Sequence, residues 1–307
     1  MHAGGIDALL RQADIAMYAA KEVKSGVEVY DLRRDGHNRS RLVLLSELRR
    51  GIAEGQLVLH FQPKVALDSG QVVGVEALVR WQHPSRGLLP PAEFLPMAEQ
   101  TGMIRLLSDA VLELALRQVR AWLDEGHSIQ VAVNVSARSL HDLDLPDRVR
   151  ESLDAHDVPG SLLRLELTES ALMADPAKAL KILQRLHADG VALSIDDFGT
   201  GYSSMSYLKR LPVDELKIDR SFVAGMATSV EDAVLVRSAV ELGHNLGLAV
   251  VAEGVETAET RCQLAELGCD VAQGYHFARP ALAGDIAGWI TRAVAPQAAG
   301  TSGARRG

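Results

Sequence analysis

Short apolar stretches with a period of two alternate with longer stretches of helical period along most of the chain. Apolar residues at every second position indicate strands, and apolar residues spaced three and four apart indicate amphipathic helices. The predicted strands lie at 57–61, 72–78, 130–135, 163–167, 191–196, 215–218, 249–252 and 270–273. The predicted helices lie at 42–54, 90–101, 105–126, 146–156, 176–190, 203–209, 231–246, 256–267 and 281–293. Eight strands with interleaved helices in about 250 residues predict an α/β fold, a (β/α)8 barrel of the TIM type.

The strand predicted at 191–196 is the one that organises the chain. It alternates apolar residues with small or polar ones and ends in two adjacent carboxylates, Asp196 and Asp197. Gly199 and Gly201 follow directly and permit backbone conformations that residues with a Cβ resist. A lone Asp-Asp pair is more often a solvated turn. Its interpretation as part of a site therefore depends on the rest of the chain.

Polar residues stand at the ends of the other predicted strands as well. With Asp196, the set comprises Glu76, Asn134, Glu166, Lys217, Glu253 and Gln273. The period of two puts most of them on the same strand face as small residues, so we expect them to point into the barrel. Barrels of this type carry out their chemistry at the carboxyl ends of the strands. Buried carboxylates are costly unless they are paired or bound to metal, so the pattern predicts a cation.

The candidate ligands are all oxygen donors. They are Glu76, Asn134, Glu166, Asp196 and Asp197, with no cysteine and no obvious histidine among them. Oxygen ligands favour Mg²⁺ or Mn²⁺ over structural Zn²⁺. Adjacent Asp196 and Asp197 suit two ions about 4 Å apart, as in two-metal phosphoesterases.

Composition narrows the class of protein. The net charge of −8 argues against a DNA or RNA polymer as partner. No apolar run approaches the roughly 20 residues of a membrane span, and no signal peptide is evident, so we expect a soluble, cytoplasmic chain without a membrane segment. The two cysteines, Cys262 and Cys269, are expected to be reduced packing residues.

An ordered series of motifs resembles the EAL family of phosphodiesterases, which hydrolyse cyclic di-GMP to the linear dinucleotide pGpG. The first is Glu76-Ala77-Leu78-Val79-Arg80-Trp81. The others are Asn134-Val135-Ser136, Glu166-Leu167-Thr168-Glu169, Asp196-Asp197-Phe198-Gly199-Thr200-Gly201, Lys217-Ile218-Asp219, Ala252-Glu253-Gly254-Val255-Glu256 and Gln273-Gly274-Tyr275. A three-letter match means little, but this ordered set, which covers about residues 42–293, is highly specific.

The resemblance implies roles for individual residues. Glu76, Asn134, Glu166 and Asp196 would hold metal, and Asp197 would hold a second ion. Lys217 would orient the attacking water or neutralise developing charge, and Glu253 would be the general base, although metal ions can also activate water without one. Glu169 would tie down the loop at 197–204, Glu256 and Gln273 would support the site, and Arg80 and Gln62 would contact the phosphate and guanine sides of cyclic di-GMP. The resemblance also implies a homodimer.

The chain ends differ from this domain. Residues 1–33 resemble the C-terminal end of a GGDEF domain, through the run Ala13-Asp14-Ile15-Ala16-Met17-Tyr18-Ala19-Ala20-Lys21, and lack its signature loop. We interpret them as a remnant without cyclase activity. Residues 34–41 are predicted to be a linker, 42–293 the EAL domain, and 294–307 a disordered tail.

Other functions were weighed against hydrolysis of cyclic di-GMP. The main alternative is a catalytically silent receptor for cyclic di-GMP, which would be expected to lack a metal carboxylate or Lys217, whereas this chain keeps all of them. A different metal-dependent phosphoesterase is a further alternative. A kinase is disfavoured, because no catalytic loop or glycine-rich phosphate loop accompanies Asp197-Phe198-Gly199.

Overall fold

The structure, a computed structural model, describes residues 32–201 and 205–294. The predicted GGDEF remnant, up to residue 31, and the tail from residue 295 lie outside the described residues. The strands are β1 (Leu57–Ala66), β2 (Val72–His83), β3 (Gly87–Leu89), β4 (Gln130–Val135), β5 (Leu163–Thr168), β6 (Ala192–Phe198), β7 (Glu215–Ile218), β8 (Ala249–Ala252) and β9 (Val271–Ala272). The α-helices are α2 (Leu32–Ala53), α3 (Pro91–Thr101), α4 (Ile104–Asp124), α5 (Leu145–Ala155), α6 (Glu169–Ala174), α7 (Pro176–Ala188), α8 (Met205–Leu208), α9 (Arg220–Gly225), α10 (Val230–Asn245), α11 (Ala258–Glu266) and α12 (Ala283–Val294).

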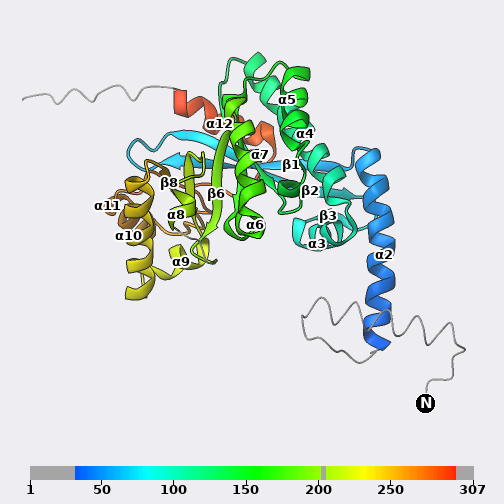
Figure 1. The fold of residues 1–307 in the computed structure, drawn as a ribbon, viewed down its shortest axis with the longest axis horizontal. Coiled ribbons are helices and arrows are strands. Elements are labelled where there is room, and N and C mark those ends of the chain that lie inside the picture. Colours follow the sequence, from blue (N-terminus) through cyan, green and yellow to red (C-terminus); the bar gives the residue numbers. More distant parts are fainter. Residues whose placement is uncertain (1–31, 202–204, 295–307) are drawn as a thin grey trace, which may run out of the picture.

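The described strands form one sheet that closes on itself. Its order is β1-β9-β8-β7-β6-β5-β4-β2-β3, and β1 also pairs with β2. This pairing closes a barrel of eight strands and leaves β3 on the outer edge of β2. Helices lie along the outside of the strands on both sides of the barrel (Figure 1). The predicted TIM-type barrel is confirmed.

The first strand departs from a regular (β/α)8 barrel. β1 runs antiparallel to both of its barrel neighbours, β2 and β9, whereas the other neighbouring pairs in the ring are parallel. Only residues 67–71 connect β1 to β2. A parallel crossover needs a dozen or more residues, so this short connection makes a hairpin. The first strand–helix unit of a regular (β/α)8 barrel is therefore replaced by two paired strands.

The two faces of the barrel strands bury different kinds of side chain. The outward positions are apolar, for example Leu165 and Leu193, and pack in the core beneath the helices. The inward positions include small residues such as Ser194 and, unusually for a protein interior, several fully buried charged groups. The charged groups are Lys64, Glu166, Glu215 and Lys217. The lumen is thus polar and leads to the carboxyl ends of the strands.

Helix α2 begins at residue 32, ten residues before the helix predicted there, so the predicted linker at 34–41 is helical. The division of the chain into domains stays a prediction. α2 extends away from the barrel, with its C-terminal end beside α3 (Figure 1). Leu48 of α2 is completely buried.

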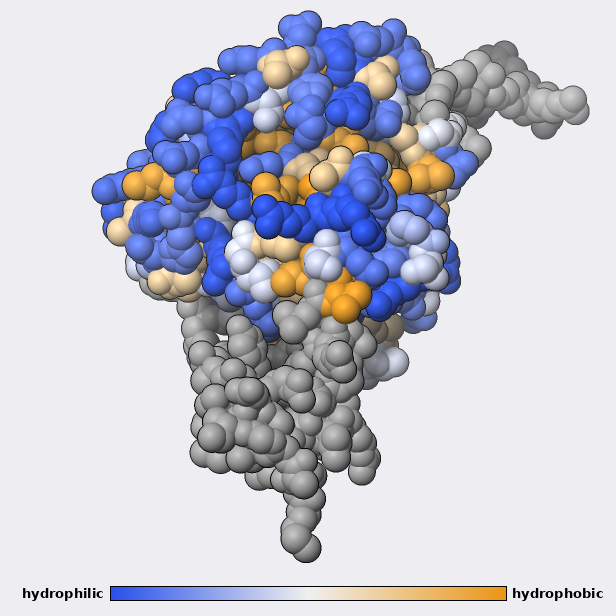
Figure 2. Space-filling model, turned by 90° about the vertical axis from the view of Figure 1, so that its right-hand side faces the viewer, coloured by the Kyte–Doolittle hydropathy of each residue, from blue (hydrophilic) through white to orange (hydrophobic). Residues whose placement is uncertain are grey.

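Hydrophilic residues cover most of the described surface on the face shown in Figure 2. Among the described residues, no helix combines the length and the apolar composition that crossing a membrane requires.

Candidate active site

The polar residues predicted at the strand ends come together at the carboxyl end of the barrel. A cavity of about 250 Å³ opens there. Its lining includes the predicted residues Gln62, Glu76, Asp196, Glu253, Glu256 and Gln273. Residues from both ends of the sequence meet in this cavity because the barrel closes between β1, β2 and β9.

The ammonium group of Lys217 lies at the centre of the carboxylates. Its Nζ is 2.9 Å from Oε2 of Glu166, 3.0 Å from Oδ1 of Asp196, 2.5 Å from Oε1 of Glu253 and 3.9 Å from Oε2 of Glu76. The side chain is only 1% exposed. Burial opposes its charge, but these carboxylates outweigh that effect and raise the pKa of Lys217 well above its usual value. Lys217 therefore remains a cation.

Glu166 is held through both carboxylate oxygens. Oε2 accepts a hydrogen bond from Lys217, and Oε1 accepts one from Lys64 at 2.7 Å. Burial favours the neutral acid, but the charges of Lys217 and then Lys64 overcome it and lower the pKa of Glu166 to about 2. Glu166 is thus a fixed carboxylate at neutral pH.

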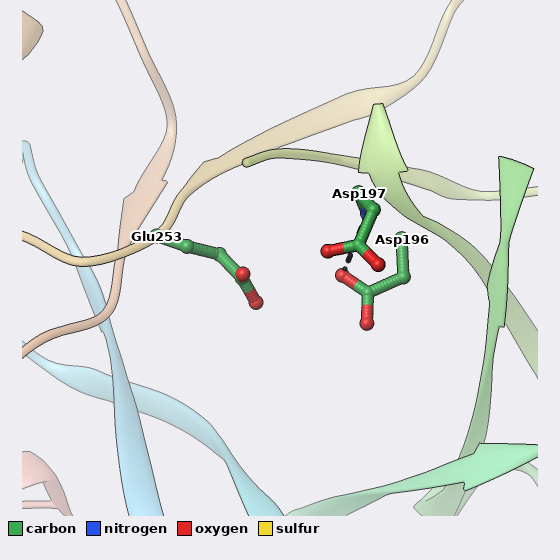
Figure 3. A group of neighbouring side chains, drawn as sticks. All are labelled: Asp196, Asp197 and Glu253. Atoms are coloured by element: carbon green, nitrogen blue, oxygen red, sulfur yellow. Dashed lines mark hydrogen bonds between the residues drawn. The ribbon is translucent and has the colours of Figure 1, made fainter. Parts of the chain in front are cut away.

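The backbone of β6 turns two successive carboxylates toward one region. In a regular strand, neighbouring side chains point to opposite faces. Here the pairing of β6 with β7 is irregular between Ile195 and Phe198, and Asp197 has a left-handed backbone with φ of 55°. Asp196, Asp197 and Glu253 consequently each offer a carboxylate oxygen, all within 4.8 Å of one another (Figure 3). Such backbone strain, about 1–3 kcal/mol, is typical of functional sites.

This crowding changes how readily two of these groups ionise. Burial, followed by the charges of Asp196 and Asp219, raises the pKa of Asp197. Burial also raises the pKa of Glu253, to about 8, and the charges of Asp196 and Glu76 add to this effect while Lys217 opposes it. These carboxylates repel one another, and a bound cation would relieve that repulsion.

Amide side chains orient Glu76. Oε1 of Glu76 accepts a hydrogen bond from Nδ2 of Asn134 at 2.7 Å, and Oε2 accepts one from Nε2 of Gln273 at 2.6 Å. The same Nε2 also donates a hydrogen bond to Oε1 of Gln62, at 3.1 Å. Nε2 of Gln62 in turn donates to the backbone carbonyl of Ala278. Gln62, Asn134 and Gln273 thus form one hydrogen-bonded set around Glu76.

Glu169, to which the resemblance assigns the loop at 197–204, contacts the backbone that follows Asp197. It is 2% exposed at the start of α6, and its Oε2 accepts a hydrogen bond from the backbone N–H of Gly199 at 3.0 Å. A Cβ at Gly201 would lie 3.0–3.1 Å from the same carboxyl group. The glycine therefore allows the loop to approach Glu169 closely.

Two predicted residues lie farther from the centre of the cluster. Glu256 is exposed at the edge of the cavity. Arg80 is half-buried in β2, and its Nη1 donates to the carbonyl of Val79 at 2.8 Å. It is absent from the residues that line the cavity.

Arg220 and Tyr275 are among the cavity residues to which sequence reasoning gave no role. The guanidinium of Arg279 lies over the ring of Tyr275, 4.5 Å from its centroid. Arg220 is the first residue of α9 and follows shortly after the end of β7. Its position as a polar residue just beyond a strand end is the sequence signal that could have placed it in the site.

The donor set fits a divalent cation. Four carboxyl groups (Glu76, Glu166, Asp196 and Glu253) surround the ammonium of Lys217. The carboxyl group of Asp197 lies beside those of Asp196 and Glu253, and the amide of Asn134 lies beside Glu76. All of these ligands offer oxygen, which hard ions such as Mg²⁺ and Mn²⁺ prefer. Carboxylates in such excess over the available cations are stabilised by a bound metal.

Comparison with known proteins agrees with this geometry. The family model described as the EAL domain matches residues 45–280. The chain is 47% identical over 274 residues to the bifunctional diguanylate cyclase/cyclic di-GMP phosphodiesterase MucR of Pseudomonas aeruginosa, covering 89% of this chain and 40% of MucR. It is 42% identical to the cyclic di-GMP phosphodiesterase NbdA of the same organism, covering 89% of this chain and 35% of NbdA. The chain thus spans well under half the length of these curated relatives.

Two solved structures are similar to this chain over nearly their whole length. One described as the PaMucR phosphodiesterase in complex with c-di-GMP has a TM-score of 0.77 at 50% identity, covering 79% of this chain and 99% of that one. An EAL domain protein from Listeria monocytogenes has a TM-score of 0.70 at 32% identity, covering 78% of this chain and 95% of that one. The chain belongs to the EAL domain family.

Proposed function

We propose that this chain is a metal-dependent phosphodiesterase that hydrolyses cyclic di-GMP to linear pGpG. The observation that carries the proposal is the convergence of Glu76, Glu166, Asp196 and Glu253 on Lys217 at the barrel mouth. The names of the relatives and the c-di-GMP complex of a structure at 50% identity support this substrate.

Two ions, Mg²⁺ or Mn²⁺, fit the proposed mechanism. Glu76, Asn134, Glu166 and Asp196 would hold one ion and Asp197 the other, and Glu253 lies close enough to Asp196 and Asp197 to contribute an oxygen. When bound, such ions polarise the phosphate and lower the pKa of water.

The remaining roles belong to residues of the chain. Lys217 keeps a positive charge beside the cluster and stabilises the negative charge that develops on the phosphate. Glu253, whose Oε1 lies 2.5 Å from Nζ of Lys217, accepts and passes on the proton of the attacking water. Glu169 fixes the loop after Asp197, and Glu256 supports the site from the cavity edge.

Substrate contacts are proposed for Gln62, Gln273 and Arg220, which line the cavity. The guanidinium of Arg220 is suited to bind phosphate in a bidentate manner. Arg80 donates to the Val79 carbonyl through Nη1, which leaves its other N–H groups for the predicted phosphate contact.

A chromatographic assay tests the proposal and separates it from the silent receptor. The purified chain is incubated with cyclic di-GMP and Mg²⁺ or Mn²⁺, with and without EDTA, and the nucleotides are resolved. We expect linear pGpG to appear and EDTA to prevent it. Binding measured by calorimetry without any product would favour the receptor, and the absence of both binding and product would refute the substrate.

A homodimer is proposed as well. Val230, Val234 and Leu235 of α10 are 80%, 56% and 50% exposed, a group of apolar side chains that a second copy could cover. Analytical ultracentrifugation should then find a dimer that Val230→Asp and Val234→Asp together dissociate. A monomeric wild type would refute this proposal.

A further inference from the structure

Lys64 is a buried cation to which the proposed mechanism gives no role. It lies on β1 and is 3% exposed. Its Nζ is 2.7 Å from Oε1 of Glu166 and 2.9 Å from Oε1 of Glu215. Lysine is rarely buried this completely unless it is paired, and both partners of Lys64 are themselves buried.

The local backbone directs this side chain into the lumen. The pairing of β1 with β2 shifts its register between Lys64 and Val65, the kind of irregularity that re-aims a side chain. The residue opposite Lys64 on β2 is Gly74. A Cβ at Gly74 would lie 3.1 Å from the backbone oxygen of Gln130, so this glycine allows β2 to approach β4 closely.

Glu215, the second partner of Lys64, is itself fixed from two sides. Ser194 Oγ donates to Oε1 of Glu215 at 2.9 Å, and Nη1 of Arg164 lies 3.0 Å from Oε2. Nζ of Lys64 donates hydrogen bonds to both Glu215 and Glu166. Lys64 therefore connects the carboxylate cluster of the site to a second group of residues, which comprises Glu215, Ser194 and Arg164.

We propose that Lys64 is a positioning residue for the metal site. By holding Oε1 of Glu166 against the fixed Glu215, it sets the plane of the carboxylate and turns Oε2 toward Lys217 and the cavity. Glu166 then presents one oxygen in a constant direction to a divalent ion. This role rests on the proposed function, in which Glu166 is a metal ligand.

The substitution Lys64→Met keeps the length and the apolar stem of the side chain and removes its ammonium. Loss of a group that orients a metal ligand typically weakens metal affinity or activity by about 10–100-fold. We therefore expect the dissociation constant for Mn²⁺, measured by calorimetry without nucleotide, to rise by about 10–100-fold. The KM for cyclic di-GMP at saturating Mn²⁺ should stay at the wild-type value, because Lys64 does not line the cavity.

Arg164→Met is the matched control. It removes a cation from the same buried group but leaves the contact between Lys64 and Glu166 in place. We expect it to bind Mn²⁺ as the wild type does. The double variant Lys64→Met with Glu215→Gln removes one charge of each sign, so it tests the same contact if Lys64→Met alone fails to fold. The affinity of the double variant for Mn²⁺ should also be lower than that of the wild type.

Wild-type affinity for Mn²⁺ in Lys64→Met, or in the double variant if only that one folds, would overturn the proposal. So would an equal loss in Arg164→Met, because the effect would then reflect packing of the whole buried group. The calorimetric measurement does not depend on turnover. If the wild type binds Mn²⁺ but hydrolyses no cyclic di-GMP, the proposed function fails while the positioning role is still tested.

Discussion

Replacing Lys217 with methionine should expose how much the carboxylate cluster depends on its central cation. The ammonium pairs with Glu166, Asp196 and Glu253 within 3.0 Å, and its side chain is 1% exposed. Methionine retains most of the volume of lysine, so the substitution removes charge while keeping packing. The carboxylates that remain would be buried beside one another, with Glu166 in contact with Lys64.

The size of the effect follows from the burial of these groups. Removing one partner of a buried ion pair typically destabilises a protein by about 3–5 kcal/mol, because the other charge stays buried without compensation. At about 2–4 °C per kcal/mol for 150–250 residues, the melting temperature in EDTA should fall by about 6–20 °C. Added Mn²⁺ should restore part of this loss, since an ion that binds only the folded state stabilises it by about 2.7 kcal/mol at 100 times its dissociation constant.

The pH dependence has a defined sign. The charges of Lys217 and Lys64 hold the pKa of Glu166 at about 2, below its usual value of 4.5. Glu166 therefore stabilises the wild type fully above about pH 4.5, and this contribution is lost as the pH falls through 2. Without Lys217 the pKa of Glu166 rises, so acid unfolding of the variant should begin at higher pH.

Thermal melts in EDTA and in Mn²⁺, from about pH 2 to pH 8, measure these effects. Lys209→Met, a substitution at an exposed lysine, is the control and should melt within 1–2 °C of the wild type, since exposed substitutions typically change stability by less than about 0.5 kcal/mol. The prediction is contradicted if Lys217→Met and the control have the same melting temperature in EDTA. It is also contradicted if Mn²⁺ raises the melting temperature of Lys217→Met less than it raises that of the wild type.

Two further predictions concern the backbone and the cysteines. Gly254 has φ of 69°, and a Cβ there would lie 2.5 Å from Cβ of Arg220, so Gly254→Ala should lower turnover of cyclic di-GMP. Gly55 also has a positive φ, 71°, but a Cβ there would have no neighbour within 4 Å, so Gly55→Ala should retain full turnover. Equal turnover rates for Gly254→Ala and Gly55→Ala would show that the predicted clash with Arg220 does not matter. Native protein at pH 8 should take up iodoacetamide at exposed Cys262, whereas Cys269 should react only after denaturation because burial raises its pKa to about 12. Mass spectrometry of labelled peptides measures this, and labelling of native Cys269 would contradict its burial.

Much of the barrel could be predicted because its parallel strands are short, apolar and separated by clear helices. The strands β4, β7 and β8 have the predicted bounds. The direction of β1 could not be obtained from periodicity, because alternation is the same in parallel and antiparallel strands. The signal for the hairpin was the short turn containing Asp68, Ser69 and Gly70, which leaves no room for a crossover helix.

The candidate site could be predicted where the strand-end rule applies, whereas the contacts of a side chain could not be predicted where they depend on its direction. Glu76, Asp196 and Glu253 reach the cavity because the carboxyl ends of barrel strands meet at one mouth. Arg80 bonds to the carbonyl of its neighbour Val79, an orientation that no sequence pattern specifies. Lys64 was also beyond prediction, since its contact with Glu166 spans 102 residues and depends on the register shift in β1.

The most direct test of the account is the rate of pGpG formation by the wild type and by Asp196→Asn, side by side in Mg²⁺. Asp196 pairs with Lys217 and accepts a hydrogen bond from the backbone N–H of Asp197, and asparagine keeps the size of the side chain while removing its charge. The account predicts EDTA-sensitive turnover by the wild type and a rate lowered by more than about 100-fold in the variant, the upper range for the loss of a group that supports a metal. Turnover of the wild type in EDTA, or a wild-type rate in Asp196→Asn, would contradict a metal-dependent site at this end of the barrel.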